Sequence, residues 1–226
     1  MRKLSVETER WEMKSPFRIT GKVFNHMDLI HVSIEQEGLI GHGEGAGVYY
    51  LGEDQQSIKG DVEKVSDELE RGADRSALYD LLPAGGARNA IDCALWDLEA
   101  KLQGCNIWDL LGIQPEPMMS VNTIGIDTPE NMARVARTLK TGRIKVKLNG
   151  DKPLERISAV CEARPDTEVV VDINQGWSFD QLAALAPQFE KLGVAMIEQP
   201  LPRGGDVELE GYSSPVPLCA DESCLH

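Results

Sequence analysis

The sequence predicts a protein of two parts, an α+β segment over about residues 1–115 followed by an α/β segment over about residues 116–226. Near the N-terminus apolar side chains alternate with period two, and from there to about residue 103 they follow the helical period. After residue 120, short apolar strands and helical stretches alternate regularly. Such alternation is typical of parallel strands covered by helices, so the second segment is either a doubly wound sheet or a barrel.

The N-terminal strands carry the clearest period-two pattern. Alternation runs over about residues 4–50, is strongest in Leu29–Ile34, and is interrupted by a turn at Glu37-Gly38, which predicts an antiparallel meander. The glycine-rich run GHGEG at residues 41–45 contains two overlapping GxG elements, but no helical pattern follows it directly. It therefore fails the context test for a dinucleotide-binding loop, and we interpret it as a bend.

Helical spacing dominates from Gly52 to Gln103. Ser57 resembles a helix cap, the stretch SALYDLLP is broken by Pro83, and a long helix over ARNAIDCALWDLEAKLQ stops at Gly104. In this last helix the apolar residues recur at i, i+4, i+7 and i+11, namely Ile91, Leu95, Leu98 and Leu102. That spacing places them on one face, which we expect to be buried.

The C-terminal segment repeats strand and helix in turn. The expected strands are residues 121–126, 144–150, 168–176, 194–200 and 217–223. The expected helices are one capped by Thr128-Pro129-Glu130, one over about 153–163, one over about 179–192, and a short stretch before the last strand. Consecutive parallel strands present their carboxyl ends at one edge, which is where sites form in α/β folds.

Composition excludes several classes of function. The 226 residues carry 23 Lys+Arg against 37 Asp+Glu, a net charge of −14 that opposes nonspecific binding to nucleic acid or anionic membranes. No stretch approaches the roughly 20 apolar residues of a membrane helix, and the N-terminus lacks the apolar core of a secretory signal. The five cysteines are odd in number and lack CxxC spacing, which predicts reduced thiols. We therefore expect a soluble, cytoplasmic globular protein that binds neither nucleic acid nor membranes.

Three acidic residues lie at or near the ends of successive apolar strands: Asp172 in VVVDIN, Glu198 in AMIEQP and Asp221 in LCADES. Separations of 26 and 23 residues each match about one strand-helix repeat, so the three carboxylates should converge. Converging buried carboxylates repel one another unless a cation lies among them, and oxygen ligands suit Mg²⁺. The alternative is that each acid caps a helix or faces solvent, which the periodic arrangement of all three disfavours.

Lys145 and Lys147 lie two residues apart within an apolar strand and therefore share one face. Ile144, Val146 and Leu148 should face the covering helices. Burial and mutual repulsion would lower the pKa of both lysines, which is how a lysine becomes a general base near neutral pH. The alternative, an edge strand whose lysines face solvent and prevent pairing, stays open for this strand taken alone.

Asn174 follows Asp172 by two residues and should share its face, where it either orients the carboxylate or serves as a turn residue at the strand end. His26, His31 and His42 lack metal-ligand spacing, and we expect no role for them in the site. The candidate site therefore consists of the three carboxylates, the two lysines and this asparagine.

These residues resemble the enolase superfamily, and within it the muconate-lactonizing-enzyme-like group. The resemblance rests on the interior KxK at Lys145 and Lys147, followed by the three acidic strand ends, and it extends along essentially the whole chain. The most specific stretches are LPAGGARNAIDCALWDLEAK, IKVKL, VVVDIN, LGVAMIEQPLP and LCADESC, which are closest to dipeptide epimerases of the L-Ala-D/L-Glu type. The resemblance implies an N-terminal α+β capping domain, residues 1–115, and part of an enolase-type modified (β/α) barrel, residues 116–226.

The resemblance also implies the chemistry. The three carboxylates would hold Mg²⁺ against the carboxylate of a small substrate, a dipeptide or an N-acyl amino acid, and the ion would stabilise an enediolate. Lys147 would move the α-proton, Lys145 would support it electrostatically and contact the substrate carboxylate, and Thr123 would contact the substrate. Loops near Phe17–Phe24 and Ala46–Leu51 would close the site and set its specificity.

One departure affects the expected activity. Epimerisation needs a second acid/base on the opposite face of the α-carbon, which the family supplies as a lysine on a strand after the third metal ligand, whereas this sequence ends at His226. Residues 120–226 suffice for roughly three to four units of a barrel that normally has about 250 residues. We therefore expect a C-terminally truncated barrel whose exposed strand edge and apolar strand faces cause poor solubility or pairing with another chain, and we expect a homo-oligomer.

Two alternatives stay open on the sequence. The same metal ligands and KxK serve N-acylamino-acid racemases, o-succinylbenzoate synthases and cycloisomerases, as the resemblance implies. A chain that lacks the second catalytic lysine could instead be a non-catalytic binding or assembly module.

Overall fold

The computed structural model describes residues 2–225 and divides the chain into two units, with boundaries after residues 14, 25 and 116. The first unit holds most of the N-terminal strands and the helices that follow them. The second unit holds the strand-helix repeats together with the tip of the first hairpin, residues 15–25. The hairpin tip is far in sequence from the strands that it contacts.

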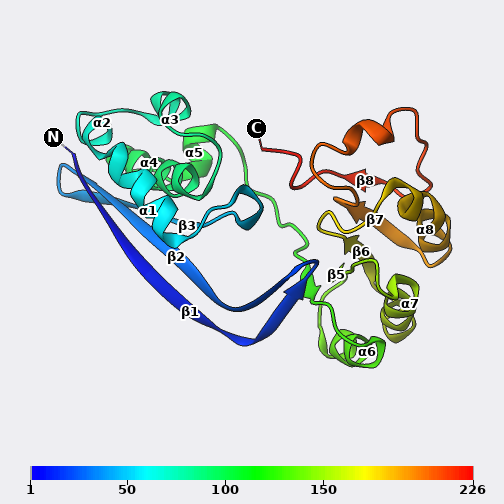
Figure 1. Ribbon diagram of the computed structural model, residues 1–226. Helices are drawn as coiled ribbons and strands as arrows, with labels where there is room; N and C mark the ends of the chain where they lie inside the picture. Colours follow the sequence, from blue (N-terminus) through cyan, green and yellow to red (C-terminus); the bar gives the residue numbers. More distant parts are fainter. Residues whose placement is uncertain (1, 226) are drawn as a thin grey trace. The chain divides into compact units, whose positions relative to one another are not determined.

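A three-stranded sheet, ordered β1 (Lys3–Ile19), β2 (Lys22–Gln36) and β3 (Leu39–Ala46), begins the chain. Strands β2 and β3 pair antiparallel through a tight turn in which Glu37 and Gly38 have φ of 57° and 77°. The predicted antiparallel meander is therefore confirmed. The helices of the first unit are α1 (Gln55–Lys64), α2 (Ser66–Glu70), α3 (Arg75–Leu81), α4 (Gly86–Gln103) and α5 (Ile107–Leu111), with a 3₁₀ turn η1 at Tyr49–Leu51 (Figure 1).

The interpretation of the GHGEG run as a bend is wrong, because residues 41–45 lie within the regular strand β3. Gly41, Gly43 and Gly45 occupy alternate positions on the face that α4 covers. A Cβ added at Gly43 would overlap the backbone oxygen of Ala90 on α4, and the other two positions are similarly crowded. The lack of side chains on this face therefore allows the α4 backbone to lie directly against the strand.

The ends of the helices follow the predicted signals, with one change. The cap of α1 is Asp54 and not Ser57: the Asp54 carboxylate accepts from the Ser57 N–H, and the Ser57 hydroxyl accepts from the Asp54 N–H. Helix α4 ends at Gly104 as predicted, where φ is 64°. Its predicted apolar face lies in the core of the unit at Ile91, Leu95 and Leu98, with Leu102 partly buried at the margin.

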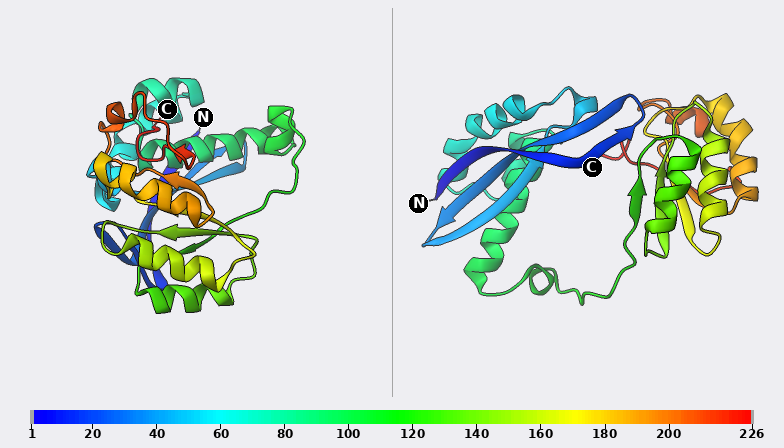
Figure 2. Two further views of the ribbon diagram at one scale, coloured as in Figure 1. Left: turned by 90° about the vertical axis from the view of Figure 1, so that its right-hand side faces the viewer. Right: turned by 90° about the horizontal axis from the view of Figure 1, so that it is seen from below.

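The second unit contains, within the described residues, a five-stranded parallel sheet whose order follows the chain. Its strands are β4 (Asn122–Ile124), β5 (Arg143–Lys147), β6 (Glu168–Asp172), β7 (Val194–Glu198) and β8 (Leu218–Cys219), and its helices are α6 (Pro129–Thr138), α7 (Pro153–Ala163) and α8 (Phe179–Lys191), with a 3₁₀ turn η2 at Asp206–Leu209. In a doubly wound sheet the strand order reverses, whereas here it does not. The left view of Figure 2 shows the three helices on one face of the sheet, so the predicted barrel architecture is confirmed.

Alternate residues of these strands form the core between the sheet and the helices. Ile144, Val146 and Leu148 are fully buried in this layer, as predicted, together with Val171 and Ile197. Since successive side chains of a strand point to opposite faces, the intervening residues lie on the face that the helices do not cover. That face carries the predicted site.

The tip of the β1–β2 hairpin packs on the carboxyl ends of the parallel strands. The Thr20 hydroxyl lies 3.0 Å from the Leu148 carbonyl oxygen and 2.7 Å from the Ile173 carbonyl oxygen, just past β5 and β6. After β4, the Ile126 N–H donates to the Arg18 carbonyl oxygen at 2.9 Å. The hairpin tip therefore lies at the same end of the sheet as the predicted site.

No helix within residues 2–225 is both long and apolar enough to cross a membrane. The five cysteines, all within this part of the chain, form no disulfide with one another.

Candidate metal centre

The register of the parallel sheet sets the positions of the predicted site residues. Lys147, Asp172 and Glu198 are direct neighbours across β5, β6 and β7, so they form one row at the carboxyl end of the sheet. Thr123 and Lys145 belong to the row two residues earlier, across β4 and β5. Neighbours in a sheet point to the same face, which here is opposite the aliphatic layer. Folding therefore gathers side chains from four strands at one edge.

The three predicted metal ligands come together in the structure. One carboxylate oxygen from each of Asp172, Glu198 and Asp221 lies within 4.8 Å of the other two. Asp172 is fully buried, Glu198 is half-buried and Asp221 is exposed, so the cluster opens to solvent on its Asp221 side. The alternative that Asp172 caps the following helix is wrong, because Ser178 caps α8.

Both lysines of β5 reach into this cluster. Lys147 Nζ lies 2.5 Å from Asp172 Oδ2, and Lys145 Nζ lies 2.9 Å from the same oxygen and 2.6 Å from Glu198 Oε1. The alternative of a solvent-facing edge strand is wrong, because β5 lies between β4 and β6 and the two lysine side chains are only 19% and 11% exposed. Two ammonium groups and three carboxylates therefore share one cluster.

Contacts within the cluster shift its protonation equilibria. Burial disfavours the charged form of Asp172, but the positive charges of Lys147 and Lys145 outweigh burial and hold the pKa of Asp172 below its ordinary value. Burial, together with the nearby charge of Asp172, raises the pKa of Glu198 despite its bond to Lys145.

The pKa of Lys145 shifts in the direction opposite to the one expected from the sequence. Burial disfavours the ammonium form, but hydrogen bonds to Asp172 and Glu198 outweigh burial and raise the pKa of Lys145. The predicted lowering is therefore wrong for this arrangement. The expectation considered burial and the neighbouring lysine, whereas the carboxylates of Asp172 and Glu198 on other strands contact the ammonium group directly.

The donor set suits a divalent cation. Three carboxylate oxygens grouped within 4.8 Å match the hard oxygen ligands that Mg²⁺ prefers. Three negative charges at this separation repel one another, and the two lysines leave the cluster with an excess of negative charge. A cation among the carboxylates would offset that excess, as the spacing along the sequence predicted.

Asn174 links the buried carboxylate to a residue that sequence reasoning missed. Its backbone N–H donates to Asp172 Oδ1 at 2.9 Å, and its Nδ2 donates to Glu222 Oε1 at 3.1 Å. Glu222 is only 1% exposed and follows Asp221 directly. Among the described residues, Asn174 Oδ1 and Glu222 Oε2 are both buried without a hydrogen-bond partner. The only sequence signal for Glu222 is its position next to a predicted ligand.

Gln199 is a second residue that sequence reasoning missed. It follows Glu198 directly and is 1% exposed, and its side chain bonds to the loop that carries Asp221. Of the histidines, His31 and His42 stack on each other in the first unit, with ring centroids 5.1 Å apart, and take no part in the cluster.

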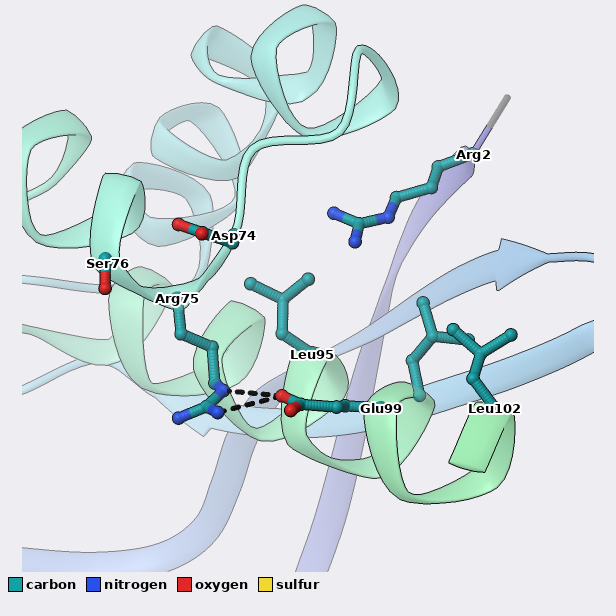
Figure 3. Close-up of a pocket in the computed structure, with 8 residues that line it drawn as sticks. Arg2, Asp74, Arg75, Ser76, Leu95, Glu99 and Leu102 are labelled. Carbon is teal, nitrogen blue, oxygen red and sulfur yellow. Dashed lines mark hydrogen bonds and ion pairs between the residues drawn. The ribbon is translucent and has the colours of Figure 1, made fainter. Parts of the chain in front are cut away.

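A cavity of about 310 Å³ lies in the first unit, beside the ion pair between Arg75 and Glu99, whose atoms are 2.8 Å apart (Figure 3). Leu95 and Leu98 line it, and Arg2, just before β1, faces it. None of the predicted site residues lines this cavity, so it is separate from the carboxylate cluster.

Known protein families match both parts of the chain. Residues 1–112 match the mandelate racemase / muconate lactonizing enzyme N-terminal domain, and residues 127–226 match the enolase C-terminal domain-like family. L-Ala-D/L-Glu epimerase of Escherichia coli is 42% identical over 228 residues, which cover 99% of this chain and 71% of that protein. N-acetyl-D-glutamate racemase of Pseudoalteromonas is 40% identical over 150 residues, which cover 66% of this chain and 48% of that protein.

Solved structures show the same similarity. One is an enolase family member from Agrobacterium tumefaciens with homology to dipeptide epimerases, which was solved with sodium and L-Ala-L-Glu. It has a TM-score of 0.93 at 33% identity, and the match covers 99% of this chain and 69% of that one. A dipeptide epimerase from Methylococcus capsulatus, solved with Mg and L-Arg-D-Lys, has a TM-score of 0.89 at 30% identity, with 99% and 68% covered. The chain thus spans from about half to about seven-tenths of the length of these relatives. Since this similarity extends over both units, the chain belongs to the mandelate racemase / muconate lactonizing enzyme family of the enolase superfamily.

Proposed function

We propose that this protein catalyses the Mg²⁺-dependent epimerisation of dipeptides of the L-Ala-D/L-Glu type. The observation that carries the proposal is the placement of Lys145 and Lys147 against three carboxylates at the ends of consecutive parallel strands. The 42% identity with an L-Ala-D/L-Glu epimerase selects among the reactions that such a site supports. The reaction is an isomerisation in which a proton leaves and returns at the carbon next to a carboxylate.

The carboxylates of Asp172, Glu198 and Asp221 would hold the metal ion, each through an oxygen of the cluster. When bound, Mg²⁺ offsets the negative charge that develops on the substrate carboxylate as the α-proton leaves. Asp172 and Glu198 belong to regular strands in direct register, so their carboxylates are held in place before the reaction begins. Such preorganisation avoids the free-energy cost of reorienting polar groups in the transition state.

Lys147 would take and return the α-proton at Nζ. It lies in the same row as Asp172 and Glu198, so its Nζ is beside the carboxylates that would face the substrate. Lys145 lies on the same face two residues earlier and bonds to both carboxylates. Its ammonium group would contact the substrate carboxylate and stabilise the charge that proton removal creates there.

Two further residues would assist. Asn174 would orient the ligands, since it bonds to Asp172 on one side and to Glu222, the neighbour of Asp221, on the other. Thr123 is exposed and pairs in register with Lys145, which supports the proposal that its hydroxyl contacts the substrate.

Complete epimerisation needs an acid or base on each face of the α-carbon. Lys147 would serve one face only, so exchange of the α-proton and inversion of configuration are separate measurements. One lysine suffices for exchange with solvent, whereas inversion also needs an acid or base on the opposite face of the α-carbon. The assay must therefore record both.

The test follows the α-proton of the C-terminal residue of L-Ala-L-Glu by NMR in D₂O with Mg²⁺. We expect loss of the α-proton signal, and we expect chelation of the metal to stop that loss. Formation of L-Ala-D-Glu, measured by chiral chromatography, reports inversion. A folded, metal-loaded protein that exchanges no dipeptide and no N-acyl amino acid would overturn the proposal and favour a non-catalytic binding module.

A second candidate is racemisation of N-acyl amino acids, which the 40% identity with an N-acetyl-D-glutamate racemase favours. It uses the same proton removal next to a carboxylate, so the cluster supports it equally. The ratio of kcat/KM for N-acetyl-D-glutamate and for L-Ala-L-Glu distinguishes the two. Substrates of o-succinylbenzoate synthases and cycloisomerases extend the same comparison to the remaining alternatives.

We also propose a homo-oligomeric protein of the cytoplasm. Within the described residues β4 and β8 are the outermost strands of the parallel sheet, and β8 has only two residues, so both edges offer backbone groups for pairing. Cysteines that are odd in number and lack CxxC spacing suit a reducing compartment. Light scattering of the purified protein should give a multiple of the chain mass, and a monomer at all concentrations would contradict the proposed assembly.

A further inference from the structure

Asp221 is the least constrained of the three carboxylates. Strand β8 consists of Leu218–Cys219 only, and its ladder with β7 ends where Glu198 pairs with Cys219. Asp221 lies two residues beyond that pair and is exposed. Sheet pairing therefore fixes Asp172 and Glu198 but not Asp221, so other contacts must hold the loop that carries the third carboxylate.

The side chain of Gln199 makes that contact. Its Oε1 accepts from the backbone N–H of Asp221 and from that of Ser223, each at 3.0 Å. Its Nε2 donates to the Leu201 carbonyl oxygen at 2.9 Å and to the Ser223 hydroxyl at 3.0 Å. A primary amide has two N–H donors and an oxygen with two lone pairs, so this buried side chain uses its whole hydrogen-bonding capacity.

The backbone of Gln199 is anchored as well. Its N–H donates to the Cys219 carbonyl oxygen, and its own carbonyl oxygen accepts from the Gln175 N–H, both at 2.8 Å. Its φ is 34°, in the left-handed region that residues other than glycine rarely adopt. Such a conformation costs free energy and persists where surrounding contacts enforce it, commonly at functional sites. The residue is therefore held in an unfavourable backbone conformation that suits its bonds to the Asp221 loop.

We propose that Gln199 is a positioning residue of the metal centre, which holds the loop of Asp221 so that the third carboxylate stays beside Asp172 and Glu198. The inference rests on the metal-binding role proposed above for these carboxylates. Because Gln199 follows Glu198 directly, one short segment carries the second ligand and fixes the third. The position of the Asp221 loop is then set by the residue that follows β7 and not by the two-residue strand β8.

The experiment measures binding of Mn²⁺ by electron paramagnetic resonance, because Mn²⁺ takes the same oxygen ligands as Mg²⁺. Gln199→Met keeps the length of the side chain but lacks all four of its hydrogen bonds. We expect the Kd for Mn²⁺ to rise about 10- to 100-fold, as is usual when a residue that orients a metal ligand is lost. A role confined to packing would lower the thermal midpoint without changing this Kd.

Ser223→Ala is the matched control. It removes the hydroxyl to which Gln199 Nε2 donates, together with the bond from that hydroxyl to Asp206, but it leaves both backbone N–H bonds to Oε1. We expect the Kd for Mn²⁺ to change less than about threefold. Circular dichroism of each variant at the assay temperature verifies that the protein is folded.

Gln199→Glu keeps the inference testable where the methionine variant does not fold. A carboxylate at this position still accepts from the N–H groups of Asp221 and Ser223, and its added negative charge attracts a cation. We expect its Kd to stay within about threefold of the wild-type value. Folded Gln199→Met with wild-type affinity, or folded Gln199→Glu with more than about tenfold weaker affinity, would overturn the inference. Wild-type protein that binds no Mn²⁺ would overturn the proposed metal role itself, so the two failures are distinguishable.

Discussion

In strands β3 and β5 alternate residues differ from an ordinary apolar face, in one strand for close packing and in the other for polar contacts. In β3, the alternate positions of residues 41–45 are glycines, and the backbone of α4 lies directly against them. In β5, the alternate positions are Lys145 and Lys147, which reach the carboxylates of neighbouring strands. In both strands the period of two identifies which residues share a face. The element that covers this face determines whether glycines, aliphatic residues or charged residues occupy it.

The difference follows from where the helices lie. Helix α4 packs closely on the β1–β3 sheet, so that face of β3 is used for packing. In the second unit α6, α7 and α8 all lie on one face of the sheet, as the left view of Figure 2 shows. The aliphatic residues of the strands meet these helices, and the opposite face is available for polar groups. Because the helices of the described part of this unit cover one face of the sheet, the other face provides a surface for chemistry.

Among the variants that compare the two strands, Lys147→Ala in β5 should have the largest effect, because it removes the proposed proton-transfer group. Since Lys147 is the group proposed to move the α-proton, we expect the exchange rate of L-Ala-L-Glu in D₂O to fall about 100- to 10,000-fold. Lys140→Ala, at an exposed lysine outside the cluster, is the matched control and should leave the rate unchanged. Equal rates in the two variants, both folded, would contradict the assignment of Lys147.

Gly43→Ala in β3 tests the close packing of α4 on that strand. The added Cβ would overlap the backbone oxygen of Ala90, which cannot move aside as the end of a flexible side chain can. We expect the free energy of unfolding to fall by about 3 kcal/mol, at the upper end of typical overpacking, as measured by denaturant titration. Gly60→Ala is the control, because a Cβ on that helical residue meets nothing within 4 Å, and it should raise stability by up to about 1 kcal/mol. Similar effects of the two substitutions would contradict close packing of α4 on β3.

Local patterns were sufficient to predict much of the second unit. Helix α7 spans Pro153–Ala163, the range predicted from the sequence, and the faces of β5 follow from strict alternation. Convergence of Asp172 and Glu198 was predictable because equal repeats of strand and helix put equivalent residues in register. These features depend on interactions within one repeat or between adjacent repeats.

Features that depend on distant contacts were not predictable. The glycines of β3 gave no sign of the helix that lies against them, since period two does not reveal what covers a strand. Thr20 bonds to carbonyl groups that are 128 and 153 residues away in the sequence. Gln199 and Asn174 make their side-chain bonds from left-handed backbone, a conformation that residues other than glycine rarely adopt and that carries no reliable sequence signal. The direction of the Lys145 pKa likewise depends on carboxylates supplied by other strands.

Asn174→Ala should sharpen the comparison within the site. The variant loses the amide that donates to Glu222, which follows Asp221, and so loosens the link between the loops of two proposed ligands. We expect the Kd for Mg²⁺, measured by calorimetry, to rise about tenfold. Asn131→Ala is the control, because Asn131 lies on α6 and bonds to Asp127 outside the cluster, and its Kd should not change. An unchanged Kd in folded Asn174→Ala would contradict the orienting role.

Ile197→Val tests whether the two faces of one strand act independently. Ile197 is fully buried in the aliphatic layer, although its neighbour Glu198 belongs to the carboxylate cluster on the other face. Loss of one methylene should lower the free energy of unfolding by about 1 kcal/mol and leave the Kd for Mg²⁺ unchanged. Denaturant titration and calorimetry on the same variant measure both quantities. Strand β7 pairs in register with β6 on one side and β8 on the other. A small cavity on its helix side should therefore not move the Glu198 carboxylate. A tenfold change in the Kd for Mg²⁺ would show that the cavity does move this carboxylate.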